Sequence, residues 1–124
     1  MTQRRGWRVT FAGVLALSLV MLFSPASGAS DVAVSDKLIH FLLFTALATT
    51  GRLAGAPALQ LAIGLVGYAG ASELLQAALP IERNGDVRDA VADVLGVATG
   101  LGIVSLASRR SAQRPGAGPR RTEL

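Results

Sequence analysis

The chain has 124 residues, of which 51% are apolar and only 16% are charged, and its formal net charge is +4. This composition argues against a soluble domain, because the few charges are bunched between long apolar runs, as in chains that span a membrane. The arginines gather near the two ends of the chain rather than on one aromatic-rich face, so we expect no nucleic-acid partner. The absence of cysteine excludes disulfides and thiolate metal sites.

The first apolar run follows a basic segment, residues 1–8, and predicts a helix near residues 9–24. This run is short, since a membrane-spanning helix needs about 20 residues. It is also similar to a secretory signal peptide, because the small residues Ala26, Ser27 and Gly28 follow it and would allow cleavage. We favour a spanning signal-anchor, since further apolar runs follow.

Three further apolar runs predict helices near residues 37–53, 58–79 and 88–108. Ser35 or Asp36 suits the N-cap of the first of these, and Pro80 ends the second. Residues 109–124 are rich in Arg, Pro and Gly and are expected to form a disordered basic tail. The sequence therefore predicts an all-α fold, a four-helix transmembrane bundle, with one membrane domain over residues 9–108.

The distribution of basic residues predicts the orientation of this bundle in its membrane. With both termini in the cytoplasm, the outer side carries only Lys37, Arg83 and Arg88. That arrangement obeys the positive-inside rule, and the inverted one would violate it. The basic residues then on the cytoplasmic side are Arg4, Arg5, Arg8, Arg52, Arg109, Arg110, Arg114, Arg120 and Arg121.

Two pairs of small residues at a spacing of four predict close helix packing. Gly96 and Gly100 form a G-x-x-x-G motif in the last helix, and Gly67 and Ala71 repeat that spacing in the helix before it. Close backbone approach holds spanning helices together, because burial among lipid tails gives little hydrophobic gain.

Polar residues from three separate segments are expected to converge at the outer end of the bundle. At about 1.5 Å of rise per residue, Glu73 and Asp93 lie about 9 to 10 Å inside their helices, and His40 about 6 Å. These three are too deep to act as helix caps, and ionisable groups at such depth are functional candidates. The candidate binding residues are Asp36, Lys37, His40, Glu73, Gln76, Arg83, Asp89 and Asp93.

Structural roles remain open for these residues. Asp36 could serve only as a cap near the positive end of a helix dipole. Asp86 and Asp89 fit a cap and its partner, and Lys37 could extend toward lipid headgroups. A purely structural ion pair could form between Glu73 and His40 or between Asp93 and Arg83.

Together these segments resemble the VanZ-like family of small multi-pass bacterial membrane proteins. The matching pieces are D-K-x-x-H-F-x-x-F from Asp36 to Phe44, E-x-x-Q at 73–76, P-x-x-R at 80–83, and R-x5-D-x3-D-x2-G at 83–96. The family pattern more often has Asn where Asp93 stands. The resemblance implies a place in the cell envelope and a link to low-level resistance to the glycopeptide teicoplanin, but it brings no agreed biochemical activity.

The favoured hypothesis is an outer polar pocket that binds an amphiphile, either a lipid-linked envelope precursor or a lipophilic drug. Lys37, Arg83 and Arg88 would then meet phosphate or carboxylate, and the deep residues would hydrogen-bond the remainder. Membrane lipids are the expected partners, a homo-oligomer is left open, and no cofactor or metal is expected.

Two other classes of function remain open. A membrane hydrolase or transferase could use His40 as general base or acid, with Glu73 or Asp93 raising its pKa. The Asp/Glu/His set could also hold a divalent metal. A transporter or helper subunit is the third reading, although the sequence has no visible inverted repeat.

Overall fold

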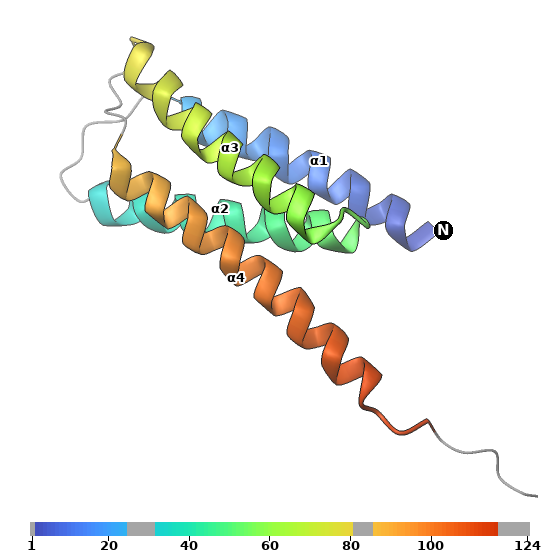
Figure 1. Cartoon of the computed structure of the whole chain (residues 1–124). Coiled ribbons are helices and arrows are strands. Elements are labelled where there is room, and N and C mark those ends of the chain that lie inside the picture. Colours follow the sequence, from blue (N-terminus) through green and yellow to red (C-terminus); the bar gives the residue numbers. More distant parts are fainter. Residues whose placement is uncertain (1, 25–31, 81–85, 117–124) are drawn as a thin grey trace, which may run out of the picture.

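The described part of the chain is entirely helical. The computed structural model describes residues 2–24, 32–80 and 86–116, with residues 32–35 described by their backbone alone. These residues form four helices, as predicted (Figure 1). They are α1 (Thr2–Phe23), α2 (Val32–Leu53), α3 (Ala58–Ala78) and α4 (Val87–Ala112).

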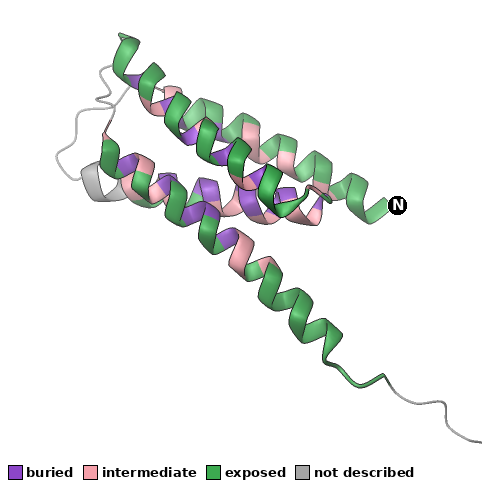
Figure 2. Cartoon of the chain, viewed as in Figure 1, coloured by how far each residue is buried: buried purple, intermediate pink, exposed green. Residues whose placement is uncertain are grey.

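Helix α2 lies at the centre of the arrangement. It contacts each of the other three helices, and its interface with α4 is the most extensive in the described chain. The chain direction alternates from one helix to the next, so α2 and α4 run parallel, and the start of α1 and the end of α4 point to the same side (Figure 1). The last turns of α4 extend beyond the other helices and are exposed (Figure 2).

Two helices begin earlier than the sequence predicted. α1 begins at Thr2, so the basic segment continues the helix; Gln and Arg are good helix formers, and no proline interrupts them. α2 begins at Val32, which places Asp36 in its second turn; the prediction of Ser35 or Asp36 as N-cap was therefore wrong.

The end of the chain also differs from the prediction. α4 continues to Ala112, and Arg109 and Arg110 lie in its last turn, where cations interact favourably with the helix dipole. The last part of the expected tail, residues 117–124, lies outside the described residues, as does the candidate cleavage site at residues 26–28.

The G-x-x-x-G motif of α4 packs directly against the backbone of α2, as predicted. A Cβ atom on Gly96 would lie 2.5 Å from the carbonyl oxygen of Phe41, and one on Gly100 would lie 2.6 Å from that of Thr45. Only glycine permits this approach. The corresponding prediction for α3 was wrong, because a Cβ atom on Gly67 would have no neighbour within 4 Å in the described chain.

Three of the described helices, α1, α3 and α4, are long and apolar enough to cross a membrane. Their outer faces expose large apolar side chains, including Leu59 (73% exposed) and Leu74 (74% exposed), as expected for contact with lipid rather than water (Figure 2). Three candidate spanning helices indicate a multi-pass membrane protein. α2 is not among them; it carries Asp36, Lys37 and Arg52 near its ends, and a spanning role for it stays a prediction.

Candidate functional site

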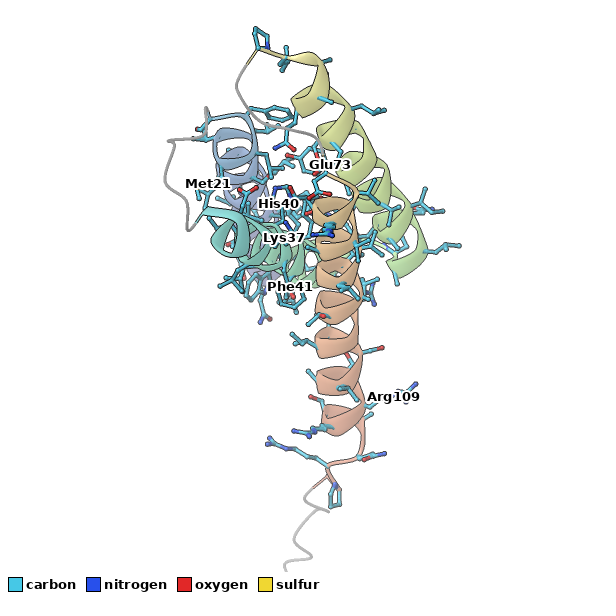
Figure 3. The ribbon with its side chains drawn as sticks, turned by 90° about the vertical axis from the view of Figure 1, so that its left-hand side faces the viewer. Met21, Lys37, His40, Phe41, Glu73 and Arg109 are labelled. Atoms are coloured by element: carbon cyan, nitrogen blue, oxygen red, sulfur yellow. The ribbon has the colours of Figure 1, made fainter. Side chains whose placement is uncertain are left out.

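Ionisable side chains from three helices meet at the end where α2 and α4 begin and α3 ends. His40 and Glu73 lie between these helices, and Arg109 lies far away near the end of α4 (Figure 3). We call the group the His40 cluster. Its members are Asp36 and His40 from α2, Glu73 from α3, and Asp89 and Asp93 from α4.

The centre of the cluster is a buried pair formed by His40 and Asp93. His40 Nδ1 lies 2.8 Å from Asp93 Oδ1, and both side chains are fully buried. Because an ionised carboxylate can only accept a hydrogen bond, we assign the imidazole proton to Nδ1, which donates it to Asp93. In the neutral ring Nε2 then carries no proton. The pair follows from the parallel packing of α2 and α4, since Asp93 lies one turn before Gly96 on the packed face.

Two more carboxylates lie near the imidazole. Asp36 Oδ2 is 3.9 Å from His40 Nε2, and Glu73 Oε1 is 3.9 Å from Nδ1. The other oxygen of Glu73 accepts a hydrogen bond of 2.9 Å from the backbone N–H of Asp86. Glu73 therefore joins the end of α3 to the start of α4 and does not point at lipid. The Glu73–His40 pair, which the sequence left open as a structural alternative, is present, but its 3.9 Å distance is longer than the 2.8 Å of the His40–Asp93 pair.

Among the described residues, Lys37 brings a positive charge to the His40 cluster. Its Nζ atom lies 3.3 Å from Asp89 Oδ1 and 3.7 Å from Asp86 Oδ2, and its side chain is 36% exposed. Asp89 is buried and faces this amine rather than acting only as a partner of the helix cap. The lysine therefore partly neutralises an otherwise acidic site.

Asp86 forms the N-cap of α4, as the sequence predicted. Its Oδ1 atom accepts a hydrogen bond of 2.9 Å from the backbone N–H of Arg88. That bond, together with the nearby charge of Lys37, lowers the pKa of the Asp86 carboxyl below its ordinary value. The contacts of Asp86 with Glu73 and Lys37 were missed by the sequence analysis, although Asp86, Asp89 and Asp93 share one helical stripe.

Two predicted site residues are not seen in the cluster: Gln76 lies elsewhere in the structure, and Arg83 is not among the described residues. Gln76 is buried, but its Nε2 donates a 2.6 Å hydrogen bond to the carbonyl oxygen of Leu22 and so completes the last turn of α1. Arg83 lies outside the described residues. Arg88 is exposed in the first turn of α4. Of the three cations expected to bind an anion, only Lys37 reaches the cluster in the described chain.

Several atoms of the cluster have hydrogen-bonding capacity that the described residues do not use. Four buried side-chain atoms have no hydrogen-bond partner there: His40 Nε2, Glu73 Oε1, Asp93 Oδ2 and Asp89 Oδ1, the last of which still faces the Lys37 amine at 3.3 Å. Buried polar atoms normally find partners, so such a concentration points to a ligand, an ion or water. Carboxylate oxygens and an imidazole can accept donors, bind a cation or transfer a proton.

A groove on the surface of the bundle adjoins this cluster at Glu73. It has a volume of about 400 Å³, lies between the end of α3 and the start of α4, and has Glu73 and Asp86 in its lining. Its apolar lining consists of Gly70, Leu74, Ala77, Val87 and Ala90. The exposed side chains of Leu74 and Val87 form its edge, so the groove opens onto the surface that would face lipid.

Comparisons of the chain with protein-family models, with curated proteins and with solved structures give no match.

Proposed function

We propose that this chain is a VanZ-like multi-pass protein of the bacterial inner membrane whose outer polar site binds the headgroup of an amphiphile. One observation carries the proposal: an apolar groove on the lipid-facing surface adjoins a buried cluster of acids and an imidazole through Glu73, which lines the groove. An amphiphile offers an apolar chain for the first and polar groups for the second. Apolar pockets with a few converging polar groups are the usual form of small-molecule sites.

The orientation follows from the charges at the two ends of the bundle. Arg4, Arg5 and Arg8 lie in the first turns of α1, and Arg109 and Arg110 lie in the last turn of α4, at the same side of the bundle (Figure 1). The positive-inside rule assigns that end to the cytoplasm. The His40 cluster then lies on the outer side, within reach of lipids in the outer leaflet, with α2 as a fourth spanning segment.

The chemistry of the cluster favours a headgroup rich in hydrogen-bond donors. Lys37 already pairs with Asp86 and Asp89, so acceptors outnumber donors in the site. Sugar hydroxyls, amides and amines supply the missing donors, and they occur both in lipid-linked envelope precursors and in lipophilic drugs. The resemblance to the VanZ-like family supports the envelope assignment, and the link to teicoplanin remains a prediction that comes with it.

Blocking the groove tests the proposal. The full chain and the variant Gly70→Leu are purified in mild detergent, and the lipids that co-purify are identified by mass spectrometry. Gly70 lines the groove and has open space at its Cβ position, so a leucine there would occupy the groove. We expect one amphiphile to be enriched on the native chain and to fall about tenfold or more on the variant, which corresponds to a loss of about 1.4 kcal/mol.

The matched control is Gly64→Leu, the same change on the same helix at another position with open space. It should keep the enriched amphiphile. Identical lipid profiles for the native chain and Gly70→Leu would contradict the proposal. In cells, alanine at His40 or Glu73 should change sensitivity to envelope-directed drugs, teicoplanin included, at unchanged protein level.

A further inference from the structure

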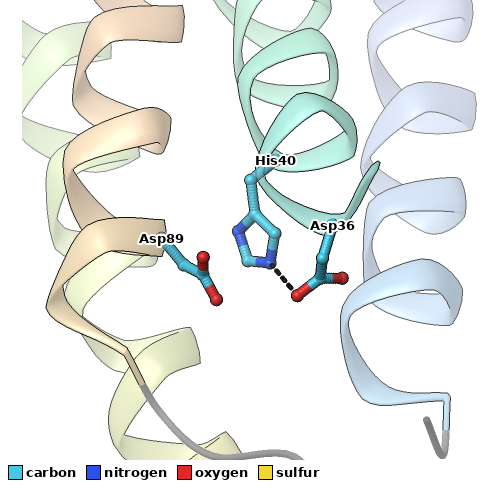
Figure 4. Close-up of side chains that lie close together, drawn as sticks. All are labelled: Asp36, His40 and Asp89. Atoms are coloured by element: carbon cyan, nitrogen blue, oxygen red, sulfur yellow. Dashed lines mark ion pairs between the residues drawn. The ribbon is translucent and has the colours of Figure 1, made fainter. Parts of the chain in front are cut away.

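His40 has one ring nitrogen engaged and the other turned into a group of acids. Nδ1 donates to Asp93, whereas the buried Nε2 has no hydrogen-bond partner among the described residues. Nε2 is directed toward Asp36, and Asp89 faces the imidazole from α4 (Figure 4). In metal centres the ligating histidine almost always donates its second ring N–H to a carboxylate or carbonyl, which fixes the tautomer and the ring orientation. His40 and Asp93 have this relationship.

We propose that Asp36, His40 through Nε2, and Asp89 bind a divalent transition-metal cation, with Asp93 as the positioning residue. One ligand atom from each of the three residues lies within 4.8 Å of the others, and the Asp36–His40 distance is 3.9 Å. Metal bonds of about 2.0 to 2.2 Å place ligand atoms at most about 4 Å apart, so small side-chain movements complete the site. Two carboxylates and a neutral imidazole balance a double positive charge.

The ligand types favour zinc or a similar transition metal over magnesium or calcium. Imidazole suits Zn²⁺ and its neighbours, whereas Mg²⁺ and Ca²⁺ prefer oxygen ligands alone. A second triplet, His40 with Glu73 and Asp93, is equally compact. It would require the 2.8 Å hydrogen bond at Nδ1 to break, so we assign the cation to the Nε2 side.

Lys37 competes for the same carboxylate. Its amine lies 3.3 Å from Asp89 Oδ1, close enough to repel an incoming cation, but it also lies 3.7 Å from Asp86 at the exposed edge. Binding of the metal would shift the lysine toward Asp86. The inference rests on the proposed function, which puts the site on the outer side of the membrane. The bound metal would add a coordination position for oxygen atoms of the headgroup.

The single histidine of the chain makes the test direct. The full chain, purified in detergent with an affinity tag that contains no histidine, is labelled with ¹⁵N-histidine and titrated with ZnCl₂. We expect the Nε2 resonance to shift and to saturate at one zinc per chain, while Nδ1 keeps its proton. An Nε2 resonance that does not respond to millimolar zinc would overturn the inference.

Variants then assign the ligands. Asp36→Asn and Asp89→Asn should weaken zinc binding about tenfold or more, and Asp93→Asn, which removes the positioning carboxylate, about 10- to 100-fold. Lys37→Met should strengthen it. Glu73→Gln should have a smaller effect than Asp36→Asn; an equal or larger effect would transfer the cation to the other triplet and overturn the assignment.

Measuring lipids on the same samples separates the two proposals. A native chain that binds no zinc but still carries the enriched amphiphile would overturn the metal site alone. Zinc that binds a chain with no enriched amphiphile would overturn the proposed function alone.

Discussion

The two ends of this bundle use charge in opposite ways. At the His40 cluster, five ionisable side chains from three helices turn inward, and His40 and Asp93 are fully buried. At the other end, arginines such as Arg4 and Arg109 are exposed. Exposed charges set the orientation of a membrane chain at little structural cost. Buried charges are costly and persist where they pair or bind something, so the two ends should respond differently to mutation.

The largest effect is expected from Asp93→Leu. It leaves His40 buried without its hydrogen-bond partner, and breaking such a pair costs about 3 to 5 kcal/mol. The measurement is the free energy of unfolding in mixed micelles titrated with denaturing detergent. The double change His40→Leu with Asp93→Leu should cost less than the sum of the two single changes, because no unpaired group is left.

The matched change at the other end is Arg109→Gln. Arg109 is exposed in the last turn of α4, so the free energy of unfolding should move by no more than about 0.5 kcal/mol. Equal losses from Asp93→Leu and Arg109→Gln would refute the contrast between the two ends.

The next effect concerns the packing that supports the cluster. Gly96→Ala would place a Cβ atom 2.5 Å from the carbonyl oxygen of Phe41, so α4 must shift away from α2, at a cost of about 1 to 3 kcal/mol. The same change at Gly67 meets open space and should stabilise the helix by up to about 1 kcal/mol, the difference in helix propensity. The free energy of unfolding is measured for both variants. A change of the same sign in both would contradict this account of the α2–α4 interface.

These two glycines also show how far the sequence could predict the structure. Hydropathy and turn residues predicted four helices, and helical spacing predicted that His40, Glu73 and Asp93 would meet. Spacing alone did not reveal that Gly96 lies in an interface while Gly67 faces outward, because that depends on how each helix is rotated against its neighbours. The same rotation decides that Asp93, rather than Glu73, bonds His40.

Gln76 is a second case in which rotation decided the outcome. It shares a helix face with Glu73 at a spacing of three, so the sequence placed both in one pocket. In the structure the longer amide side chain reaches the backbone of α1 at Leu22, where a carbonyl oxygen at the helix end lacks an intrahelical donor. No pattern in the sequence marks that carbonyl as an available partner.

A smaller effect is expected from Gln76→Leu. The change leaves the buried carbonyl oxygen of Leu22 without its donor and should cost about 1 kcal/mol of unfolding free energy. Gln60→Leu, an identical substitution at an exposed position of the same helix, is the control and should change stability by less than about 0.5 kcal/mol. If both variants have the same free energy of unfolding, the hydrogen bond from Gln76 to α1 contributes nothing measurable to stability.

The smallest effect belongs to Asp86, at the exposed edge of the cluster. Its pKa is lowered in the folded chain by the N–H of Arg88 and by Lys37, so its stabilising contribution is present above the unfolded pKa of about 3.9 and is lost as pH falls through the lower folded value. Asp86→Ser keeps a cap acceptor but removes the titration. The difference in unfolding midpoint between the native chain and this variant should therefore be constant above about pH 5 and shrink below about pH 4. A difference that grows on acidification would mean that Asp86 is destabilised by the neighbouring acids Glu73 and Asp89 more than it is stabilised by Lys37 and the helix terminus, and the edge of the cluster would then behave like its buried centre.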